Sequence, residues 1–263
     1  IPVWETFGPE DDVSGAAIAD VNRDGWLDLV VGHHFNSTLS QGNQVPVRLY
    51  LNTTAAVGDV PSFSDVTEES GLIGLPTKAP HVELADLDND GWLDILTSAA
   101  AGDGSVPAIF HNEGLDGDTP RFAAPTGLGS PQYWVTAPTN DVDRDGRLDM
   151  LAVEWEPSLP SILFMNQTPG GHWLEVSVDD RYAGVGSRVD IYEAGTGQTS
   201  LIGSREIVAT LGYTAGVDRV AHFGLGEVAS VDVRITPPFG AAPTLFEGVS
   251  ADARIAIGGS CNG

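Results

Sequence analysis

Three loops of the form D-x-[D/N]-x-D-G-x-x-D recur along the chain and carry residue types that bind hard cations. Side chains at loop positions 1, 3 and 5 can converge on one point, and the glycine at position 6 permits a sharp turn. A carbonyl at position 7 and the aspartate at position 9 complete a set of oxygen ligands, which suits calcium better than zinc or copper. The predicted ligands are Asp20, Asn22, Asp24, Trp26 and Asp28; Asp86, Asp88, Asp90, Trp92 and Asp94; and Asp141, Asp143, Asp145, Arg147 and Asp149.

The loops differ from EF-hands at position 12 and in their flanking segments. An EF-hand carries glutamate at position 12 and is flanked by helices, whereas position 12 here holds Val31, Thr97 and Ala152 and the next runs are apolar and strand-like. We therefore expect calcium loops within β-hairpins. Asp, Asn and Gly also form good turns without a metal, but three copies in phase with the same glycine favour metal binding.

The overall charge supports the same interpretation. The chain has 37 acidic and 12 basic residues, which gives a formal net charge of −25. Two carboxylates about 4 Å apart repel by about 4 kcal/mol at an effective dielectric of about 20, so the loops should open without a cation. We expect about three calcium ions to relieve this repulsion. The same negative field repels phosphate backbones, which argues against a nucleic acid partner.

A repeated β unit must position these loops. The loop segments are followed by a second recurring element, and each segment is short and bounded by Gly, Pro, Asn or Asp, which is typical of strands. The pattern predicts three units of about four antiparallel strands, as in propeller blades. The repeated segments are 15–32, 81–98 and 136–153, with the second element at 48–52, 108–112 and 162–166.

The repeat stops near residue 168, and Gly-rich turns separate a further series of strand-like segments. We therefore expect an all-β protein with two domains. Blade-like, calcium-binding repeats of β-propeller type would occupy residues 1–167, and a β-sandwich or barrel-like module would occupy residues 168–263.

Several classes of protein are excluded by single features. The only cysteine, Cys261, excludes an internal disulfide and a Cys-based zinc site, and the only lysine, Lys78, lies in no phosphate-binding loop motif. No apolar run reaches the roughly 18 residues of a membrane helix, so we expect no membrane span. The residues from Ile1 do not begin a signal peptide, as a mature, truncated or internal start would not.

Differences between the repeats suggest a second site at the ends of equivalent strands. His33 and His34 occupy a position that holds Ala99-Ala100 and Glu154-Trp155 in the other repeats. Glu154 and Glu156 would share a strand face at i, i+2, a spacing that could serve acid–base chemistry. Solvated strand ends also tolerate polar residues, so a catalytic or transition-metal site here is an alternative to a purely structural role.

Single residues in the repeats also have two interpretations. His111 replaces Leu51 and Met165 and is interpreted as a satisfied, partly buried histidine. Trp26 and Trp92 could stack on sugars, but packing under a neighbouring loop is favoured. Of the three N-x-[S/T] sequences, at Asn36, Asn52 and Asn166, two lie in the second recurring element, and we interpret them as structural asparagines.

The loops, each followed by an apolar strand, resemble the FG-GAP/VCBS repeats of integrin-α-type β-propellers. The tail resembles the ASPIC/UnbV module of the cartilage acidic protein-like family. It departs from that pattern at Ser187, where alanine is usual, and at Pro237-Pro238, where Trp-Pro is usual. The matching tail residues are Asn166, Trp173-Leu174, Gly186 to Val189, Arg205-Glu206, Gly212-Tyr213, His222 to Gly226 and Pro238 to Gly240.

The resemblance implies a secreted or periplasmic, calcium-binding interaction protein. We expect a non-catalytic scaffold that binds a protein partner or assembles with other subunits. A glycan-binding module or carbohydrate-active enzyme is the alternative, because some calcium propellers act on sugars. A purely structural subunit is a third possibility. Three repeats are too few to close a propeller, so the tail, another subunit or preceding sequence would have to cover the arc.

Overall fold

The computed structural model describes residues 11–35, 47–72, 81–97, 108–128, 134–154, 156–179, 184–211 and 215–257. Over these residues the structure is nearly all β, and the one helical segment is the 3₁₀ turn η1 (Pro238–Gly240). In this part of the chain, no helix has the length and apolar character needed to cross a membrane. The predicted all-β class is confirmed.

Each repeat forms one four-stranded antiparallel sheet. In the first two sheets the strands run in order β1-β2-β3-β4 and β5-β6-β7-β10, and in the third sheet β13 lies between β14 and both β11 and β12. The strands are β1 (Asp11–Ala19), β2 (Asp28–Phe35), β3 (Val47–Asn52), β4 (Phe63–Asp65), β5 (Val82–Ala85), β6 (Asp94–Thr97), β7 (Ala108–Phe110), β10 (Thr126–Gly127), β11 (Trp134–Thr136), β12 (Thr139–Asn140), β13 (Asp149–Glu154) and β14 (Ile162–Phe164). A separate hairpin joins β8 (Asn112–Asp116) and β9 (Thr119–Phe122).

The acidic loops connect the same two strands in every repeat, at the same register. Each loop is closed by a pair of facing residues, of which the second is the aspartate at position 9. The buried apolar side chains of the repeats form two clusters, one within the first two sheets and one within the second and third. The closing pairs are Ala19 and Asp28, Ala85 and Asp94, and Asn140 and Asp149.

The tail forms two sheets around a core of its own. One sheet has the order β20-β15-β23, with β15 and β23 parallel, and the other has the order β17-β16-β21-β22. Leu174, Ile191 and Val233 are fully buried between them. The strands are β15 (His172–Val178), β16 (Arg188–Glu193), β17 (Leu201–Glu206), β20 (Val220–Gly226), β21 (Ser230–Thr236), β22 (Thr244–Ser250) and β23 (Ala253–Ile257), with a small pair β18 (Thr210–Leu211) and β19 (Ala215–Gly216).

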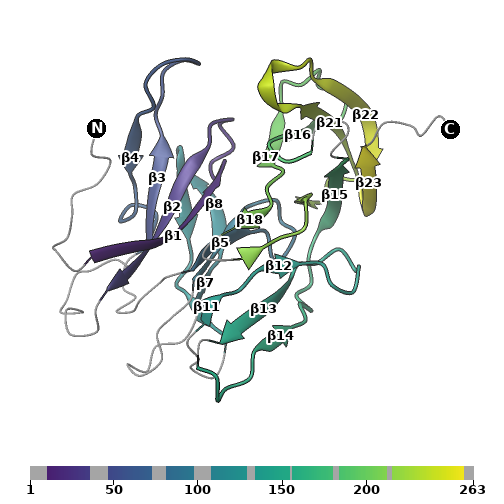
Figure 1. The fold of residues 1–263 in the computed structure, drawn as a ribbon. Coiled ribbons are helices and arrows are strands. Elements are labelled where there is room, and N and C mark those ends of the chain that lie inside the picture. Colours follow the sequence, from purple (N-terminus) through teal and green to yellow (C-terminus); the bar gives the residue numbers. More distant parts are fainter. Residues whose placement is uncertain are drawn as a thin grey trace.

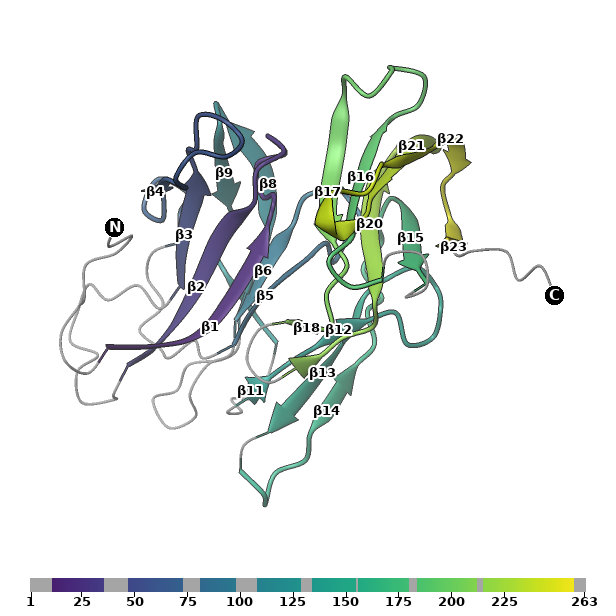
Figure 2. The ribbon, with the colours of Figure 1, turned by 45° about the horizontal axis from the view of Figure 1, so that its top comes forward.

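Five sheets of three or four strands therefore follow one another in the described residues, in a propeller-like arrangement (Figures 1 and 2). The repeats supply three of these sheets, as the sequence predicts, and the tail supplies two more. In Figure 1 the first sheet lies on the left, the third at the bottom and the tail sheets at the upper right.

The tail packs directly on the acidic loops of the repeats. Backbone N–H groups of Gly171 and Gly226 donate to the carbonyls of Asp88 and Asn89 in the second loop, at 3.1 and 2.8 Å. At the third loop, the indole of Trp173 lies against Gly146 so closely that a Cβ there would overlap the ring. The loops are thus part of an interface within the chain.

This interface predicts unequal effects of two glycine substitutions. Gly146 and Gly58 both have left-handed φ values, of 90° and 94°, but nothing surrounds the Cβ position of Gly58. We expect Gly58→Ala to cost about 1–3 kcal/mol through backbone strain alone. Gly146→Ala should cost about 1–3 kcal/mol more, because its methyl group also displaces Trp173. Urea unfolding measures both, and equal losses would contradict the packing described.

Candidate metal centres

All three acidic loops adopt the same backbone conformation. The residue at position 4 and the glycine at position 6 both have positive φ, a region that residues with a Cβ rarely occupy. The hairpin therefore turns twice within one loop and directs successive side chains inward. The φ values are 61° for Arg23, 57° for Asn89, 66° for Arg144, 88° for Gly25, 94° for Gly91 and 90° for Gly146.

The aspartate at position 1 organises each loop by accepting backbone hydrogen bonds. In the second loop, Asp86 Oδ1 accepts from Asp90 N at 3.1 Å and Asp86 Oδ2 accepts from Gly91 N at 2.9 Å. Asp20 and Asp141 accept the equivalent pairs of bonds in the other loops. The Oδ1 atom of each of these aspartates accepts one such bond and retains a further lone pair, so this role is compatible with metal ligation.

The aspartate at position 9 links the loop to the recurring asparagine of the same repeat. Asp28 accepts hydrogen bonds from Val21 N at 2.8 Å and Asn52 N at 2.9 Å, and the side chain of Asn52 donates to the carbonyl of Leu27 at 3.1 Å. The same bonds recur at Asp94 with Asn112 and at Asp149 with Asn166.

This linkage explains why an asparagine recurs in the second element of each repeat. The sequence pattern indicates a structural role for Asn52 and Asn166, but by itself it does not connect these residues with the loop. The available signal for this link was that an asparagine follows the last loop aspartate in every repeat. Asn36 lies outside the described residues.

Side-chain donors converge in two of the three loops. In the third loop, carboxylate oxygens of Asp141, Asp143 and Asp149 lie within 4.8 Å of one another. In the second loop, Asp88 and Asp90 converge with His111 instead. Both clusters could hold a metal ion. They are the two groups of at least three Asp, Glu, His or Cys side chains with this geometry in the described ranges.

The first loop differs because position 3 is an amide. Asn22 donates to Asp24 Oδ2 at 3.0 Å, and Asp24 N bonds to Asn22 Oδ1 at 3.2 Å. At position 5, a carboxylate accepts the N–H of position 7 in all three loops, as Asp24 does from Trp26 at 2.8 Å. Ligation by the carbonyls of position 7, in Trp26, Trp92 and Arg147, stays a prediction.

Burial raises the pKa of several loop carboxyls. It raises the pKa of Asp20 to about 6 and that of Asp28 to about 7, and the charge of Asp24 adds to both shifts. In the second loop, burial raises the pKa of Asp86 to about 7 and that of Asp94 to about 6. These carboxyls lack sufficient positive charge around them, which a bound cation would supply.

Three arginines supply part of that positive charge. Arg205, from β17 of the tail, lies near Asp86 and Asp20; burial lowers its pKa to about 10, and the two aspartates oppose that shift. Arg254, from β23, contacts Asp141 and Glu175. Arg23 lies over the ring of Trp92, with Cζ 3.5 Å from its centroid. Through Arg205 and Arg254, the tail therefore places positive charge beside carboxylates of all three loops.

Of the two tryptophans at position 7, Trp92 is packed against its neighbours. Trp92 is covered by Arg23 of the preceding loop, and a Cβ at Gly114 would touch its ring. Trp26 is half-buried. Of the two interpretations offered for these residues, packing under a neighbouring loop is what the structure shows for Trp92.

The two glutamates expected to share the end of a strand are arranged differently in the structure. Strand β13 ends at Glu154, and Glu156 lies in the following turn, where its N–H bonds to Glu154 Oε1 at 3.2 Å. The expectation that both glutamates share a strand face is therefore wrong, because Glu156 lies beyond the end of β13. Trp155, Ala99-Ala100 and Cys261 lie outside the described residues, as do the side chains of His33 and His34.

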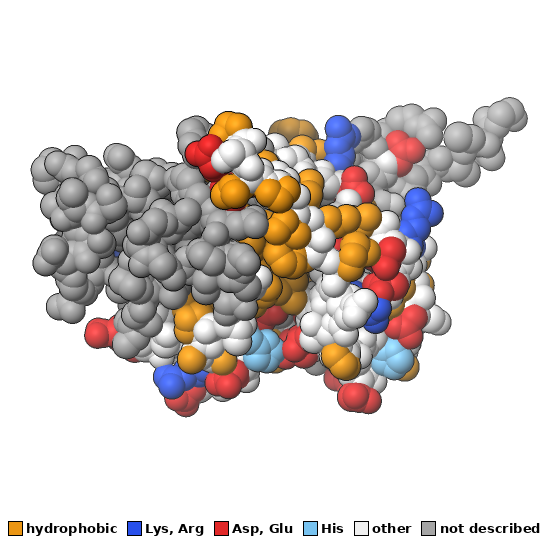
Figure 3. All heavy atoms as spheres, turned by 90° about the horizontal axis from the view of Figure 1, so that it is seen from below, with side chains coloured by type: hydrophobic (Ala, Val, Ile, Leu, Met, Phe, Trp, Pro, Cys, Tyr) orange, Lys and Arg blue, Asp and Glu red, His pale blue; other side chains and the backbone are white. Residues whose placement is uncertain are grey.

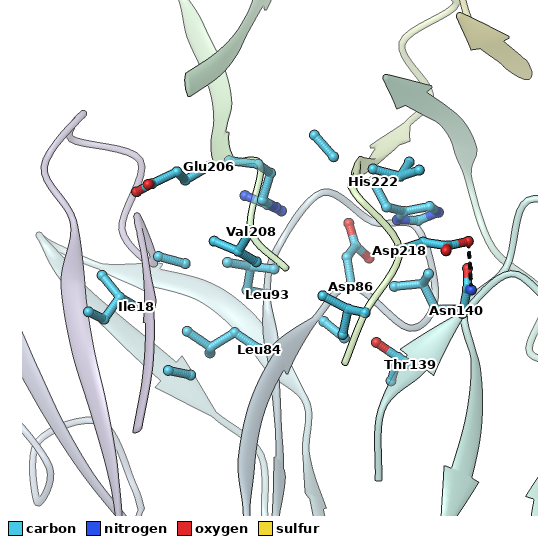
Figure 4. Close-up of a pocket in the computed structure, with 18 of the residues that line it drawn as sticks. Ile18, Leu84, Asp86, Leu93, Thr139, Asn140, Glu206, Val208, Asp218 and His222 are labelled. Carbon is cyan, nitrogen blue, oxygen red and sulfur yellow. Dashed lines mark hydrogen bonds between the residues drawn. The ribbon is translucent and has the colours of Figure 1, made fainter. Parts of the chain in front are cut away.

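A cavity of about 490 Å³ lies between the first strands of the repeats and the tail. Figure 4 shows Ile18 and Leu84 on one side, His222 on the other and the hydrogen bond from Asn140 to Asp218 at 3.0 Å. Burial lowers the pKa of His222 to about 4, so this imidazole is neutral near pH 7 and its Nε2 lies 3.1 Å from the carbonyl oxygen of Gly146. The cavity thus adjoins the loops.

Comparison with known families finds a match in the tail. Residues 178–260 match the family described as ASPIC and UnbV. The resemblance stated from the tail residues is confirmed.

Similarity extends beyond the tail to particular proteins. The chain is 31% identical over 245 residues to cartilage acidic protein 1 of Homo sapiens, which covers 88% of this chain and 34% of that protein. It is 28% identical over 236 residues to cartilage acidic protein 1 of Xenopus tropicalis, with 86% and 34% covered. Integrin alpha-4 of Xenopus laevis matches over 112 residues at 33% identity, with 41% and 10% covered. The chain spans about a third of the length of the cartilage acidic proteins.

The raised carboxyl pKa values predict an unusual pH dependence in the metal-free protein. Between pH 4 and 7 the folded Asp28 and Asp86 carboxyls keep protons that the unfolded chain releases. The free energy of unfolding should therefore fall as the pH rises, by about 1.4 kcal/mol per pH unit for each proton of difference.

Urea unfolding in EGTA between pH 4.5 and 7.5 measures this slope. Asp28→Asn should reduce it, whereas Asp59→Asn, at an exposed position, should leave it unchanged. A free energy of unfolding that stays constant or rises with pH would contradict the predicted shifts.

Proposed function

We propose that this chain is a calcium-stabilised, non-catalytic β scaffold that mediates protein–protein interaction, as a subunit of a larger extracellular or periplasmic assembly. The observation that supports this most directly is the third loop, where oxygens of Asp141, Asp143 and Asp149 converge within 4.8 Å. The donors are all carboxylate oxygens, the type that calcium prefers. About three calcium ions would bind, one per loop, through the fifteen residues named from the repeated pattern.

The chemistry of the residues present fits a hard cation. Asp143 is exposed at the third loop. Asp141 and Asp149 are buried and already held in place by backbone N–H groups, which would orient their carboxylates for ligation. When bound, calcium would supply positive charge beside buried carboxylates and hold positions 1, 3 and 9 together.

The proposed division into domains follows the same logic. We propose blade-like repeats over residues 1–167 and an ASPIC/UnbV-like module over residues 168–263. The separate core of the tail and the family match over residues 178–260 support this division. The contacts of Gly171, Gly226 and Trp173 with the loops would make calcium binding and tail docking interdependent.

Interaction with a protein is favoured by the surface as well as by the relatives. Leu151 and Leu163 face each other across β13 and β14 and are 42% and 45% exposed, with Met165 nearby in sequence at 41%. Figure 3 shows apolar side chains gathered in the middle of one face, with acidic and histidine side chains towards its border. Exposed apolar side chains bordered by polar ones are typical of interaction surfaces.

The expected calcium affinity favours a location outside the cytosol. Extracellular calcium modules bind with Kd on the order of 10⁻⁴–10⁻³ M, a range that suits calcium-rich compartments outside the cytosol.

The names of the relatives, cartilage acidic protein and integrin alpha, designate no enzyme. A sugar-processing role would use the tryptophans and Glu154 with Glu156, but Trp92 is covered and Glu156 lies in a turn.

Native mass spectrometry with and without EGTA tests this proposal. We expect three calcium ions per 27.6 kDa chain, lost in EGTA together with several degrees of melting temperature, because ligand binding to the folded state alone stabilises it. A calcium-loaded assembly of several chains would also support the scaffold. Absence of bound calcium, with melting unchanged in EGTA, would contradict it.

A charge-only substitution separates ligation from folding. Asp143→Asn should weaken calcium binding at the third loop on the order of tenfold or more, since it removes one anionic ligand. In EGTA the same variant should be as stable as the wild type or more so, because carboxylate repulsion is reduced. Asp116→Asn, at an exposed position of the β8–β9 hairpin, is the matched control, and calorimetric titration gives both affinities.

A further inference from the structure

The second loop contains a nitrogen donor at a position that is apolar in the other repeats. His111 lies between β7 and β8, directly before Asn112, and the equivalent residues before Asn52 and Asn166 are Leu51 and Met165. An imidazole is therefore not required for the repeat to fold.

The imidazole points at the loop carboxylates. His111 Nδ1 lies 3.0 Å from Asp94 Oδ1 and 3.7 Å from Asp88 Oδ2. A ring nitrogen of His111 and oxygens of Asp88 and Asp90 all lie within 4.8 Å of one another. The His111 side chain is 44% exposed, so an ion can reach it from solvent.

Satisfying Asp94 does not account for the histidine. Asp94 already accepts hydrogen bonds from Leu87 N at 3.2 Å and Asn112 N at 2.8 Å. Asp28 and Asp149 have the same two backbone donors in their own loops, and no imidazole is needed there. The contact between His111 and Asp94 is thus an additional interaction that has no counterpart in the other two loops.

Donor chemistry distinguishes this cluster from the third loop. Calcium takes oxygen ligands, whereas imidazole combined with carboxylates suits zinc and related first-row dications. We propose that the second loop is a mixed nitrogen–oxygen site that binds a transition-metal dication such as zinc through His111 and the carboxylates of Asp88 and Asp90. This rests on the proposed cation-binding function of the loops. Calcium occupies the second loop when it is the only metal, and zinc displaces it there but not from the third loop.

The selectivity is tested by titrating zinc into the protein saturated with calcium, using isothermal calorimetry. The wild type should bind one zinc ion tightly, and His111→Leu should weaken that binding by on the order of 10- to 100-fold. The leucine is the residue of the first repeat, so the variant is compatible with the fold. His111→Met, with the residue of the third repeat, should behave in the same way.

A second histidine provides the matched control. His172 Nδ1 lies 2.7 Å from Asp252 Oδ2, and its side chain is 40% exposed, but it belongs to no metal-binding cluster among the described residues. His172→Leu should leave zinc affinity unchanged. Nitrogen NMR of the histidine rings should show the His111 resonances moving to metal-bound values on zinc addition, which requires no variant.

The outcomes separate this inference from the proposed function. Equal zinc affinity in the wild type and His111→Leu, or unmoved His111 resonances, would overturn the mixed site. If calcium binds and zinc does not, the scaffold proposal stands and the mixed site fails. If neither metal binds, both fail.

Discussion

The concentration of carboxylates at one end of three β-hairpins is the constraint on which the rest of the structure depends. Each loop buries the aspartates at positions 1 and 9, and burial without compensation is costly for an anion. Backbone N–H groups provide a first compensation in every loop, as at Asp86 and Asp28. They do not suffice, because the pKa of both carboxyls is raised to about 7.

The tail compensates the buried carboxylates a second time, with positive charge and a backbone donor, and these contacts hold it to the repeats. Arg205 reaches the carboxylates of the first two loops, and Arg254 contacts Asp141 in the third. Gly224 N donates to Asp86 Oδ2 at 3.1 Å, so one predicted metal ligand also holds the tail. The proposed cation binding and the docking of the tail would therefore act on the same carboxylates, which would give calcium a structural role.

The three repeats have one backbone plan and different donor sets. All keep the turn at position 6, but position 3 is Asn22 in the first loop, and His111 approaches the second. The backbone hydrogen bonds common to all three loops are accepted by the aspartates at positions 1, 5 and 9. A common loop can thus offer three coordination environments, because position 3 and the residue before the recurring asparagine can vary without loss of those bonds.

The sequence by itself determined the all-β class and the three loops, because a nine-residue pattern specifies its own local turn. Contacts between distant segments were decided by tertiary structure alone. The ring of Trp92 is covered by Arg23, and Arg205 is brought from the tail to loops more than a hundred residues earlier. For the same reason the sequence indicates only a satisfied histidine at His111, and the folding of the chain between β7 and β8 places its ring beside the second loop. Periodicity carries no information about such contacts, since they depend on how separately formed sheets pack.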